Sequence, residues 1–600
     1  MSNISMSNMS QDNYYDYVVV GAGVSGLYTA HELYKKYPSA SICVLEATAY
    51  IGGRLHSIKY DGLIMDGGGA RFNTDQHRIV SLIKELNLWD KVIPIKTDST
   101  YKPVNDTYKS LAQVFPTIDE FIKYMKKYIK DNNIKRDTLV NTTIIEFAEK
   151  HFIKEYPNIN HYLINIYPYY SELIVLNALE SINLFSNELS EKTNYFILNG
   201  GLEQITETLY NKLKKLKQNK NCNNNKCNID IYKETPVLEI KHEQNDIGID
   251  SHKYIIKTDN MGSQASNEQG KIFTAKNIII TIPKNKLIKI KFSLSGGNHN
   301  NHTKLKEFKN NINSVQNEPL YRIYARYPLD KKTNKVWFDG MGKIVTDLPI
   351  KYIIPNNYKK GVIMISYTDS KFARYWVKQV ADGTFETTLN KQLKQLFPDI
   401  DIPKAKWYKH CPWVSGAGYW KKGYDRKVIM PKMIQPLGSN ENIYICGENY
   451  SSHQAWVEGS LETSEMVLDK LDRNRSSQKE KTKTIKKVQN INNVTKVKNM
   501  KNMNINKVMK GGKTKKNTKL NTKEKEYTLE EVAKHNTKSD AWIVIHGKVA
   551  NITNWIPKHP GGDIIMKGVG KDATTLFNSI GHDDYAKKML KQYQIGILKK

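Results

Sequence analysis

The stretch "YDYVVVGAGVSGLYTAHEL" (15–33) runs from a β-branched strand through three glycines into a helix. Gly21, Gly23 and Gly26 follow the spacing Gly-x-Gly-x-x-Gly, which permits a tight turn and a close backbone approach to a pyrophosphate. The phosphates would meet the positive end of the helix. The next strand, "SICVLEA", ends in Glu46, whose carboxylate can bond ribose hydroxyls. These features predict a dinucleotide-binding α/β domain.

Further glycine-rich motifs follow at spacings typical of one protein family. "EATAYIGGRLHS" (46–57) places Gly-Gly-Arg just beyond the acid, and "MDGGGARF" (65–72) adds three more glycines and an arginine. "NIYICGENYSSHQAWVEG" (442–459) supplies Gly447 and Glu448 ahead of a helix. With these motifs the chain resembles the flavin-containing amine oxidases, which include monoamine, polyamine and L-amino-acid oxidases. The resemblance spans residues 14–471.

The resemblance implies an FAD-binding Rossmann-like domain and an α+β substrate domain. FAD-binding segments are expected at 14–72, 196–283 and 441–471, with a mainly helical substrate segment at 73–195 and a sheet segment at 284–440. The residues expected to contact FAD are Gly21, Gly23, Gly26, Glu46, Gly53, Arg54, Gly69, Ala70, Arg71, Val237, Gly447, Glu448, Trp456 and Val457.

The resemblance also implies two aromatic side chains that flank the substrate amine. "WVSGAGYW" puts Tyr419 at the first position, and "HQAWVEG" puts Trp456 at the second. In monoamine oxidases a cysteine bound covalently to flavin precedes the first aromatic residue, whereas this chain has Gly418. We therefore expect FAD to be held non-covalently. Without the family context, both aromatic residues would be interpreted as ordinary core.

The substrate half is most similar to the L-amino-acid oxidases. Arg71 matches their arginine that binds the substrate carboxylate, because a guanidinium can grip a carboxylate through two parallel hydrogen bonds. A structural ion pair is the alternative role for Arg71. The chain departs from the pattern at two places. Ile353 or Ile354 stands where those enzymes carry a tyrosine, and Arg322 stands where the family has a lysine that holds a water near the flavin. The second departure leaves oxygen reactivity open.

A separate region at 526–600 resembles cytochrome b5. Its stretch "HPGGDIIMKGVGKDATTLFNSIGHDD" (559–584) contains His559 and His582, which match the two axial ligands of haem b. "AWIVIHGKVANIT" (541–553) predicts two short strands. Iron with two protein ligands has no open position, so this domain would transfer single electrons and not bind oxygen. The alternative is a haem-less relative that binds a small apolar ligand.

About half of the net charge of +31 lies in one segment. Residues 473–525 carry 18 Lys or Arg against two Glu. The stretch has no aromatic residues and no apolar periodicity, so 472–525 is predicted to be a disordered linker. Such a segment can bind nucleic acid without specificity. We favour a solvated tether in a lysine- and asparagine-biased sequence.

The cysteines and the N-terminus indicate the compartment. The five cysteines fit neither a disulfide framework nor a zinc site, and Cys222 and Cys227 are interpreted as loop thiols. The sequence shows no signal peptide and no membrane-spanning stretch. We expect an intracellular, cytoplasmic location, and packaging in a viral particle stays open. The sequence does not indicate an oligomeric state.

These features together predict an FAD-dependent amine oxidoreductase fused to a cytochrome b5-like domain. The expected reaction is oxidative deamination of a primary amine, foremost an L-amino acid. It would proceed by hydride transfer to flavin, imine hydrolysis and hydrogen peroxide formation, with molecular oxygen or the haem domain as electron acceptor. The alternatives are a polyamine or monoamine oxidase, a desaturase-type flavoprotein, or a catalytically impaired cofactor-binding protein that docks to nucleic acid through its basic tether.

Overall fold

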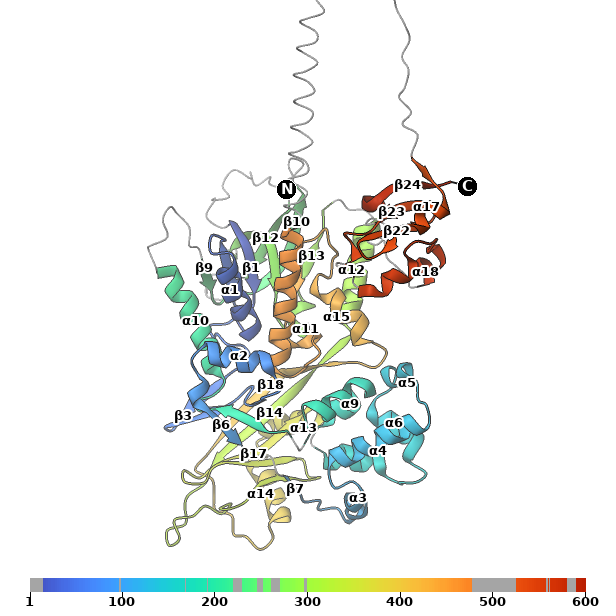
Figure 1. Ribbon diagram of the computed structural model, residues 1–600. Coiled ribbons are helices and arrows are strands. Elements are labelled where there is room, and N and C mark those ends of the chain that lie inside the picture. The colour runs from blue at the N-terminus through green and yellow to red at the C-terminus, as the bar shows by residue number, and fades with distance from the viewer. Residues whose placement is uncertain are drawn as a thin grey trace, which may run out of the picture. The chain divides into compact units, whose positions relative to one another are not determined.

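The chain divides into two compact units, unit 1 (Met1–Lys486) and unit 2 (Lys487–Lys600) (Figure 1). The predicted loop thiols, His582 and most of the predicted linker lie outside the described residues. The computed structural model describes residues 14–95, 99–167, 169–190, 193–218, 229–244, 252–259, 270–295, 299–476, 525–556, 559, 562–579 and 590–599.

The largest sheet of unit 1 has the strand order β13-β10-β11-β12-β1-β2-β9, with β19 also paired to β12. β1 runs parallel to both β12 and β2. Val18 and Val19 in β1 are fully buried, as expected for a parallel strand covered on both faces. The strands are β1 (Tyr14–Val20), β2 (Ile42–Leu45), β9 (Ile229–Tyr232), β10 (Val237–Gln244), β11 (His252–Thr258), β12 (Ile272–Ile280), β13 (Lys291–Ser293) and β19 (Ile443–Ile445). β13 lies beyond residue 283, where the second FAD-binding segment was expected to end.

Helices cover this sheet through apolar faces that pack on the strands. Leu27, Ala30 and Leu33 of the first helix are fully buried in the core that also contains Val19 and Val44. The helices near the sheet are α1 (Val24–Lys36), α2 (His77–Glu85), α10 (Glu203–Gln218), α11 (Lys284–Leu287), α12 (His299–Ile312) and α15 (Arg426–Ile434), and a last helix spans 457–476. Smaller strands join the segments: β3 (Ser57–Tyr60) with β4 (Leu63–Asp66), and β5 (Phe72–Asn73), β8 (Tyr195–Leu198) and β6 (Val92–Ile95).

A second sheet of unit 1 has the order β18-β14-β17-β16-β15-β7. Its two longest strands, β14 and β18, are antiparallel, and Gln316 pairs with Tyr419. The strands are β7 (Ser99–Tyr101), β14 (Val315–Arg326), β15 (Lys343–Val345), β16 (Tyr352–Asn357), β17 (Val362–Asp369) and β18 (Trp407–Trp420). Helices α13 (Ser370–Ala381) and α14 (Phe385–Leu396) carry Trp376 and Leu389 into the core of this sheet.

The predicted helical segment of unit 1 is helical, and Figure 1 shows α4, α5, α6 and α9 gathered in one group. Helices begin where short polar side chains satisfy free N–H groups: Thr143 and Glu146 form a capping box at α6. The helices are α3 (Lys109–Val114), α4 (Ile118–Asp131), α5 (Arg136–Val140), α6 (Ile144–Phe152), α7 (Ile159–Ile166), α8 (Tyr170–Ile174) and α9 (Ala178–Asn187). Among the described residues, no helix combines the length and the apolar character needed to cross a membrane.

Unit 2 contains a small mixed sheet with the order β20-β24-β23-β22-β21. The predicted hairpin is present: β22 (Asp540–Ile545) and β23 (Lys548–Asn551) are antiparallel and joined by His546 and Gly547. The other elements are β20 (Glu526–Tyr527), α17 (Leu529–Ala533), β21 (Asn536–Thr537), η7 (Gly562–Gly568), α18 (Thr574–Ser579) and β24 (Gln594–Leu598).

Candidate active site

A cavity of about 1020 Å³ lies in unit 1, lined by both large sheets and by the helical segment. Nearly all site residues predicted for unit 1 line it. They are Gly21, Gly23, Glu46, Gly53, Arg54, Gly69, Ala70, Arg71, Val237, Arg322, Tyr419, Gly447, Glu448, Trp456 and Val457. Gly26 does not line the cavity. Its role is packing, because a Cβ there would stand 2.0 Å from the carbonyl oxygen of Gly21.

The glycine turn after β1 forms one end of the cavity. Gly21 has φ +107°, which favours glycine, and Gly23 is the N-cap of α1 without any side-chain cap. A Cβ on Gly23 would meet no protein atom closer than 3.9 Å, so the space beside it is open. An uncapped helix N-terminus next to open space suits an anionic group.

Two charged side chains complete this end, which we call the dinucleotide end. The Glu46 carboxylate accepts hydrogen bonds from the Ala22 N–H at 2.9 Å and from the Thr48 N–H at 3.0 Å. Arg54 is held by Glu448 at 2.5 Å and by the carbonyl oxygen of Gly416 at 3.1 Å. A fixed carboxylate suits a ribose diol, and the guanidinium suits a pyrophosphate. The residues present therefore fit FAD.

Position 418 bears on how a flavin would be attached. A Cβ at Gly418 would lie 2.2 Å from the side-chain nitrogen of Asn449, so a side chain here would displace Asn449. The described cysteines are Cys43, Cys411 and Cys446, and none of them lines the cavity.

Arg71 also lines the cavity, and we call the part around it the substrate end. Its guanidinium carbon is 4.2 Å from the ring centroid of Tyr195 and 5.8 Å from that of Trp456. The Tyr195 and Trp456 rings are stacked with centroids 6.0 Å apart. No acidic side chain of the described residues forms an ion pair with Arg71. The Arg71 guanidinium therefore packs against aromatic rings and has no acidic partner among the described residues.

Arg322 is anchored by a backbone group. Its Nη1 donates to the carbonyl oxygen of Asp66 at 2.8 Å, and its guanidinium carbon lies 5.0 Å from the Tyr367 ring centroid. Burial raises the pKa of Asp66 to about 6, although the Arg322 charge opposes this shift. Neither Ile353 nor Ile354 lines the cavity.

Sequence reasoning missed several polar residues of the substrate end. The buried Tyr419 hydroxyl donates to Glu172 at 3.0 Å, and Glu172 and Asp369 both line the cavity. Tyr169 and Tyr367 line it too and supply hydroxyls near Arg71. The tyrosine-rich run "YPYYSEL" (167–173) was the only sequence signal for Tyr169 and Glu172. The partners lie far apart along the chain, so no spacing rule connects them.

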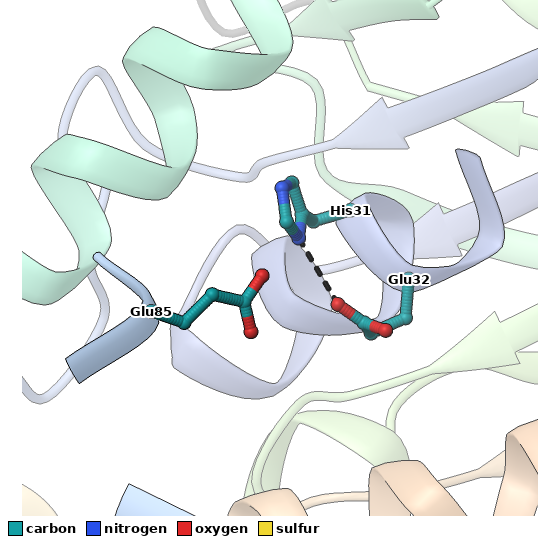
Figure 2. Close-up of side chains that lie close together, drawn as sticks. All are labelled: His31, Glu32 and Glu85. Carbon is teal, nitrogen blue, oxygen red and sulfur yellow. Dashed lines mark hydrogen bonds and ion pairs between the residues drawn. The ribbon is translucent and has the colours of Figure 1, made fainter. Parts of the chain in front are cut away.

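A group of His31, Glu32 and Glu85 could hold a metal ion by its ligand types, and Figure 2 shows these side chains close together. His31 Nδ1 lies 3.1 Å from Glu32. The ammonium of Lys35, however, is 2.9 Å from Glu32 and 3.1 Å from Glu85. Lys35 therefore already supplies the cation that these carboxylates need.

In unit 2, His559 is partly buried, and its N–H donates to the carbonyl oxygen of Ile556 at 3.2 Å. An apolar cluster fills the interior of this unit. Partly buried side chains that pack against it include Trp555, Ile565, Met566 and Phe577. A partly buried histidine is the type of residue that can hold one side of a haem. The expected second ligand, His582, lies outside the described residues.

Comparisons with known proteins agree with this geometry. Residues 24–467 match the family model "Flavin containing amine oxidoreductase", and residues 528–599 match "Cytochrome b5-like Heme/Steroid binding domain". A solved structure of a putrescine oxidase mutant has a TM-score of 0.55 and 17% identity, covering 77% of this chain and 99% of that one. At this identity, the likeness shows the fold.

Two relatives match different parts of the chain. Uncharacterized protein R188 of Acanthamoeba polyphaga mimivirus is 22% identical over 521 residues, which is 77% of this chain and 96% of that protein. Cytochrome b5 of Oryza sativa subsp. japonica is 48% identical over 77 residues, which is 13% of this chain and about half (56%) of that protein. The two families imply FAD and haem as cofactors. The chain belongs to the flavin-containing amine oxidoreductases and carries a cytochrome b5-like domain at its C-terminal side.

Proposed function

We propose that this amine oxidoreductase acts on L-amino acids, with Arg71 as the ligand of the substrate carboxylate. The observation that carries the proposal is the guanidinium in the cavity, which has aromatic neighbours and no ion pair among the described residues. A partly buried cation without a protein counter-anion is poorly compensated, and a ligand carboxylate would supply two parallel hydrogen bonds. The alternative role of Arg71, a structural ion pair, gains no support from the described part of the chain.

The other residues of the substrate end position the amine. Tyr419 and Trp456 are proposed to flank the reacting carbon and its nitrogen. Glu172 fixes the Tyr419 hydroxyl, and Tyr195 supports the Trp456 ring by stacking. Aromatic walls exclude water, which keeps the amine in its neutral, reactive form.

FAD is proposed to bind at the dinucleotide end without a covalent bond, because Gly418 stands at the position of the flavin-bound cysteine and no described cysteine lines the cavity. When bound, FAD supplies the two-electron oxidant for the carbon–nitrogen bond, with oxygen as terminal acceptor and hydrogen peroxide as its product. The overall balance is amino acid, oxygen and water giving a keto acid, ammonia and hydrogen peroxide.

A visible spectrum of the purified protein, before and after anaerobic addition of L- and D-amino acids, tests the proposal. We expect a flavin band that bleaches with L-amino acids and not with their D-enantiomers. Peroxide should then form stoichiometrically when oxygen is admitted. Bleaching only by amines that lack a carboxylate would contradict the amino-acid assignment. Salt-sensitive DNA binding without bleaching by any amine would favour the impaired, nucleic-acid-docking alternative.

The second unit is proposed to accept electrons singly, since two histidine ligands would give haem the chemistry of electron transfer. Anaerobic stopped-flow with substrate distinguishes this role: the haem band should become reduced after the flavin band bleaches. A haem band that stays oxidised throughout would rule the role out. The variant His559→Ala is the control, because it should lose the haem band and keep flavin bleaching.

A further inference from the structure

Two acidic side chains from distant parts of unit 1 line the substrate end of the cavity. Glu172 lies on α8 and is 8% exposed, whereas Asp369 ends β17 and is 5% exposed. The residues are nearly two hundred positions apart, and both occur among the lining residues together with Arg71 and Tyr419. We call Glu172 and Asp369 the acidic pair.

Neither member of the acidic pair forms an ion pair with a residue of the described ranges. Glu172 accepts the Tyr419 hydroxyl at 3.0 Å, and Asp369 accepts the Ser171 N–H at 2.6 Å. Both contacts are hydrogen bonds from neutral groups. The nearby Glu318 has its own basic partner, Arg374, at 3.2 Å. The acidic pair is therefore buried without an ion-pair partner among the described residues, an arrangement that costs free energy unless a ligand compensates.

Arg71 and Glu172 both lie near Tyr169. Burial raises the pKa of Tyr169, the Arg71 charge lowers it, and the Glu172 charge raises it. Tyr169 is thus close enough to both charges to be affected by each, whereas Arg71 and Glu172 form no ion pair with each other. The substrate end therefore has a positive part and a negative part with an aromatic side chain next to both.

We infer that the substrate is an L-amino acid with a terminal ammonium on its side chain, bound by Glu172 and Asp369 while Arg71 binds its carboxylate. The inference rests on the proposed function and adds the substrate class. The acidic pair suits the distal ammonium better than the reacting amine, because two carboxylates would stabilise the protonated form of an amine that must be neutral to react. A ligand with both groups would compensate both buried charges.

Four related compounds separate the two parts of the site: L-lysine, L-norleucine, 1,5-diaminopentane and pentylamine. They carry both the carboxylate and the distal ammonium, only the carboxylate, only the ammonium, and neither. For the wild-type holoenzyme we expect kcat/KM for L-lysine to exceed that for L-norleucine by about a hundredfold, the size expected for charge-assisted hydrogen bonds. The variants Glu172→Gln and Asp369→Asn should each reduce that ratio by about tenfold or more.

Glu441→Gln serves as the matched control. Glu441 is a buried carboxylate that accepts the Tyr254 hydroxyl at 2.9 Å and does not line the cavity. It should leave the lysine-to-norleucine ratio unchanged, which separates a loss of the ammonium site from the general effect of removing a buried charge. Thermal denaturation of each variant reports whether it is folded.

Binding gives a readout that does not depend on turnover. Calorimetric titration of the FAD-loaded protein with 6-aminohexanoate and hexanoate compares the same carboxylate with and without the ammonium. We expect 6-aminohexanoate to bind about tenfold more tightly, and expect this difference to disappear in Glu172→Gln.

The outcomes distinguish failure of the inference from failure of the proposed function. Equal affinity for the two acids, or L-norleucine oxidised as well as L-lysine, would overturn the inference and leave an L-amino-acid oxidase. Rapid oxidation of 1,5-diaminopentane with no oxidation of any amino acid would overturn both the amino-acid assignment and the inferred substrate class. If Glu172→Gln and Asp369→Asn fold and keep the wild-type ratio, the acidic pair does not bind the substrate.

Discussion

The two ends of the unit 1 cavity differ in what lines them. At the dinucleotide end, glycines of four motifs line the cavity, and the charged side chains are held by the protein itself, as Arg54 is by Glu448. At the substrate end, Arg71 and the acidic pair are side chains without ion-pair partners in the described part of the chain. At the first end, backbone and paired side chains are already arranged for a dinucleotide. At the second end, the charged side chains could be paired by a bound ligand.

This difference has a consequence for substitution. A substitution at a glycine of the dinucleotide end should impair folding if the added atoms meet protein. It should impair cofactor binding if they extend into the cavity. A substitution at the substrate end should leave the dinucleotide end intact and alter which substrate is accepted.

Two glycines of one motif should fail in different ways. Gly26→Ala places a Cβ 2.0 Å from the Gly21 carbonyl oxygen, so we expect destabilisation by about 3 kcal/mol or outright misfolding. Gly23→Ala meets no protein atom closer than 3.9 Å, so it should fold normally and bind FAD at least about tenfold more weakly. Thermal denaturation and flavin content after gel filtration measure the two effects. Full flavin content in Gly23→Ala would contradict the proposal that FAD binds close to the backbone at Gly23.

Removal of an aromatic wall should affect every substrate alike. Trp456→Ala loses the stacking on Tyr195 and one of the two rings near Arg71, so we expect kcat/KM to fall by about tenfold or more. The loss should be similar for L-lysine and L-norleucine, in contrast to the acidic-pair variants. Trp456→Phe keeps a ring and should recover most of the rate. A loss confined to L-lysine would place Trp456 with the acidic pair instead.

The preference for a cationic side chain should depend on pH. Burial, and for Glu172 the nearby Asp369 charge, raise the pKa of both acids above their usual range. The groups around them are Tyr169, Tyr419 and Glu318, and the buried Lys351 also interacts with Asp369.

At acidic pH the pair is neutral. As the pH rises through the raised pKa values, the pair becomes charged while a lysine ammonium, with pKa about 10.4, stays protonated. The lysine-to-norleucine ratio of kcat/KM should therefore increase with pH through the neutral range, by about tenfold. A ratio that is flat or falls with pH would contradict the assignment.

A smaller effect is expected at the segment that carries Trp456. Burial lowers the pKa of His453, but the hydrogen bond and charge of Glu188, 2.5 Å away, outweigh it and raise the pKa. This ion pair is fully formed below the ordinary histidine pKa, and its contribution is lost as the pH rises through the raised value. The side chain is a third exposed, so the change should stay below about 1 kcal/mol. The thermal stability of the wild type should fall towards that of His453→Gln across this interval, and parallel curves would show that the pair contributes nothing.

The sequence indicates one part of the dinucleotide end, the glycine turn and the acid that follows it, through local signals. Gly21, Gly23 and Glu46 lie within twenty-six residues, and each motif specifies backbone geometry that can be inferred without the rest of the chain. Arg71 and Trp456 were reached only through resemblance to a family. The hairpin of unit 2 was predictable from its two short apolar stretches and the His-Gly turn between them.

The acidic pair could not be predicted in the same way. Glu172 lies in a short helix among tyrosines, and Asp369 ends a buried strand, where a lone carboxylate suggests a helix cap or a turn. Only the folded chain shows that both residues line the cavity of Arg71. The lack of ion-pair partners for these charges is likewise a property of three-dimensional packing, which spacing in the sequence does not encode.

The most direct test of the central claim is the rate of anaerobic flavin bleaching by L-lysine in the wild type and in Arg71→Met, with pentylamine as the substrate that lacks a carboxylate. Arg136→Met, which removes an arginine paired with Asp425 at 2.8 Å outside the cavity lining, is the matched control. We predict that Arg71→Met slows bleaching by L-lysine by about a hundredfold and leaves pentylamine within a few-fold of wild type. Equal slowing for both compounds, or no slowing for L-lysine, would contradict the assignment of Arg71 as the carboxylate ligand.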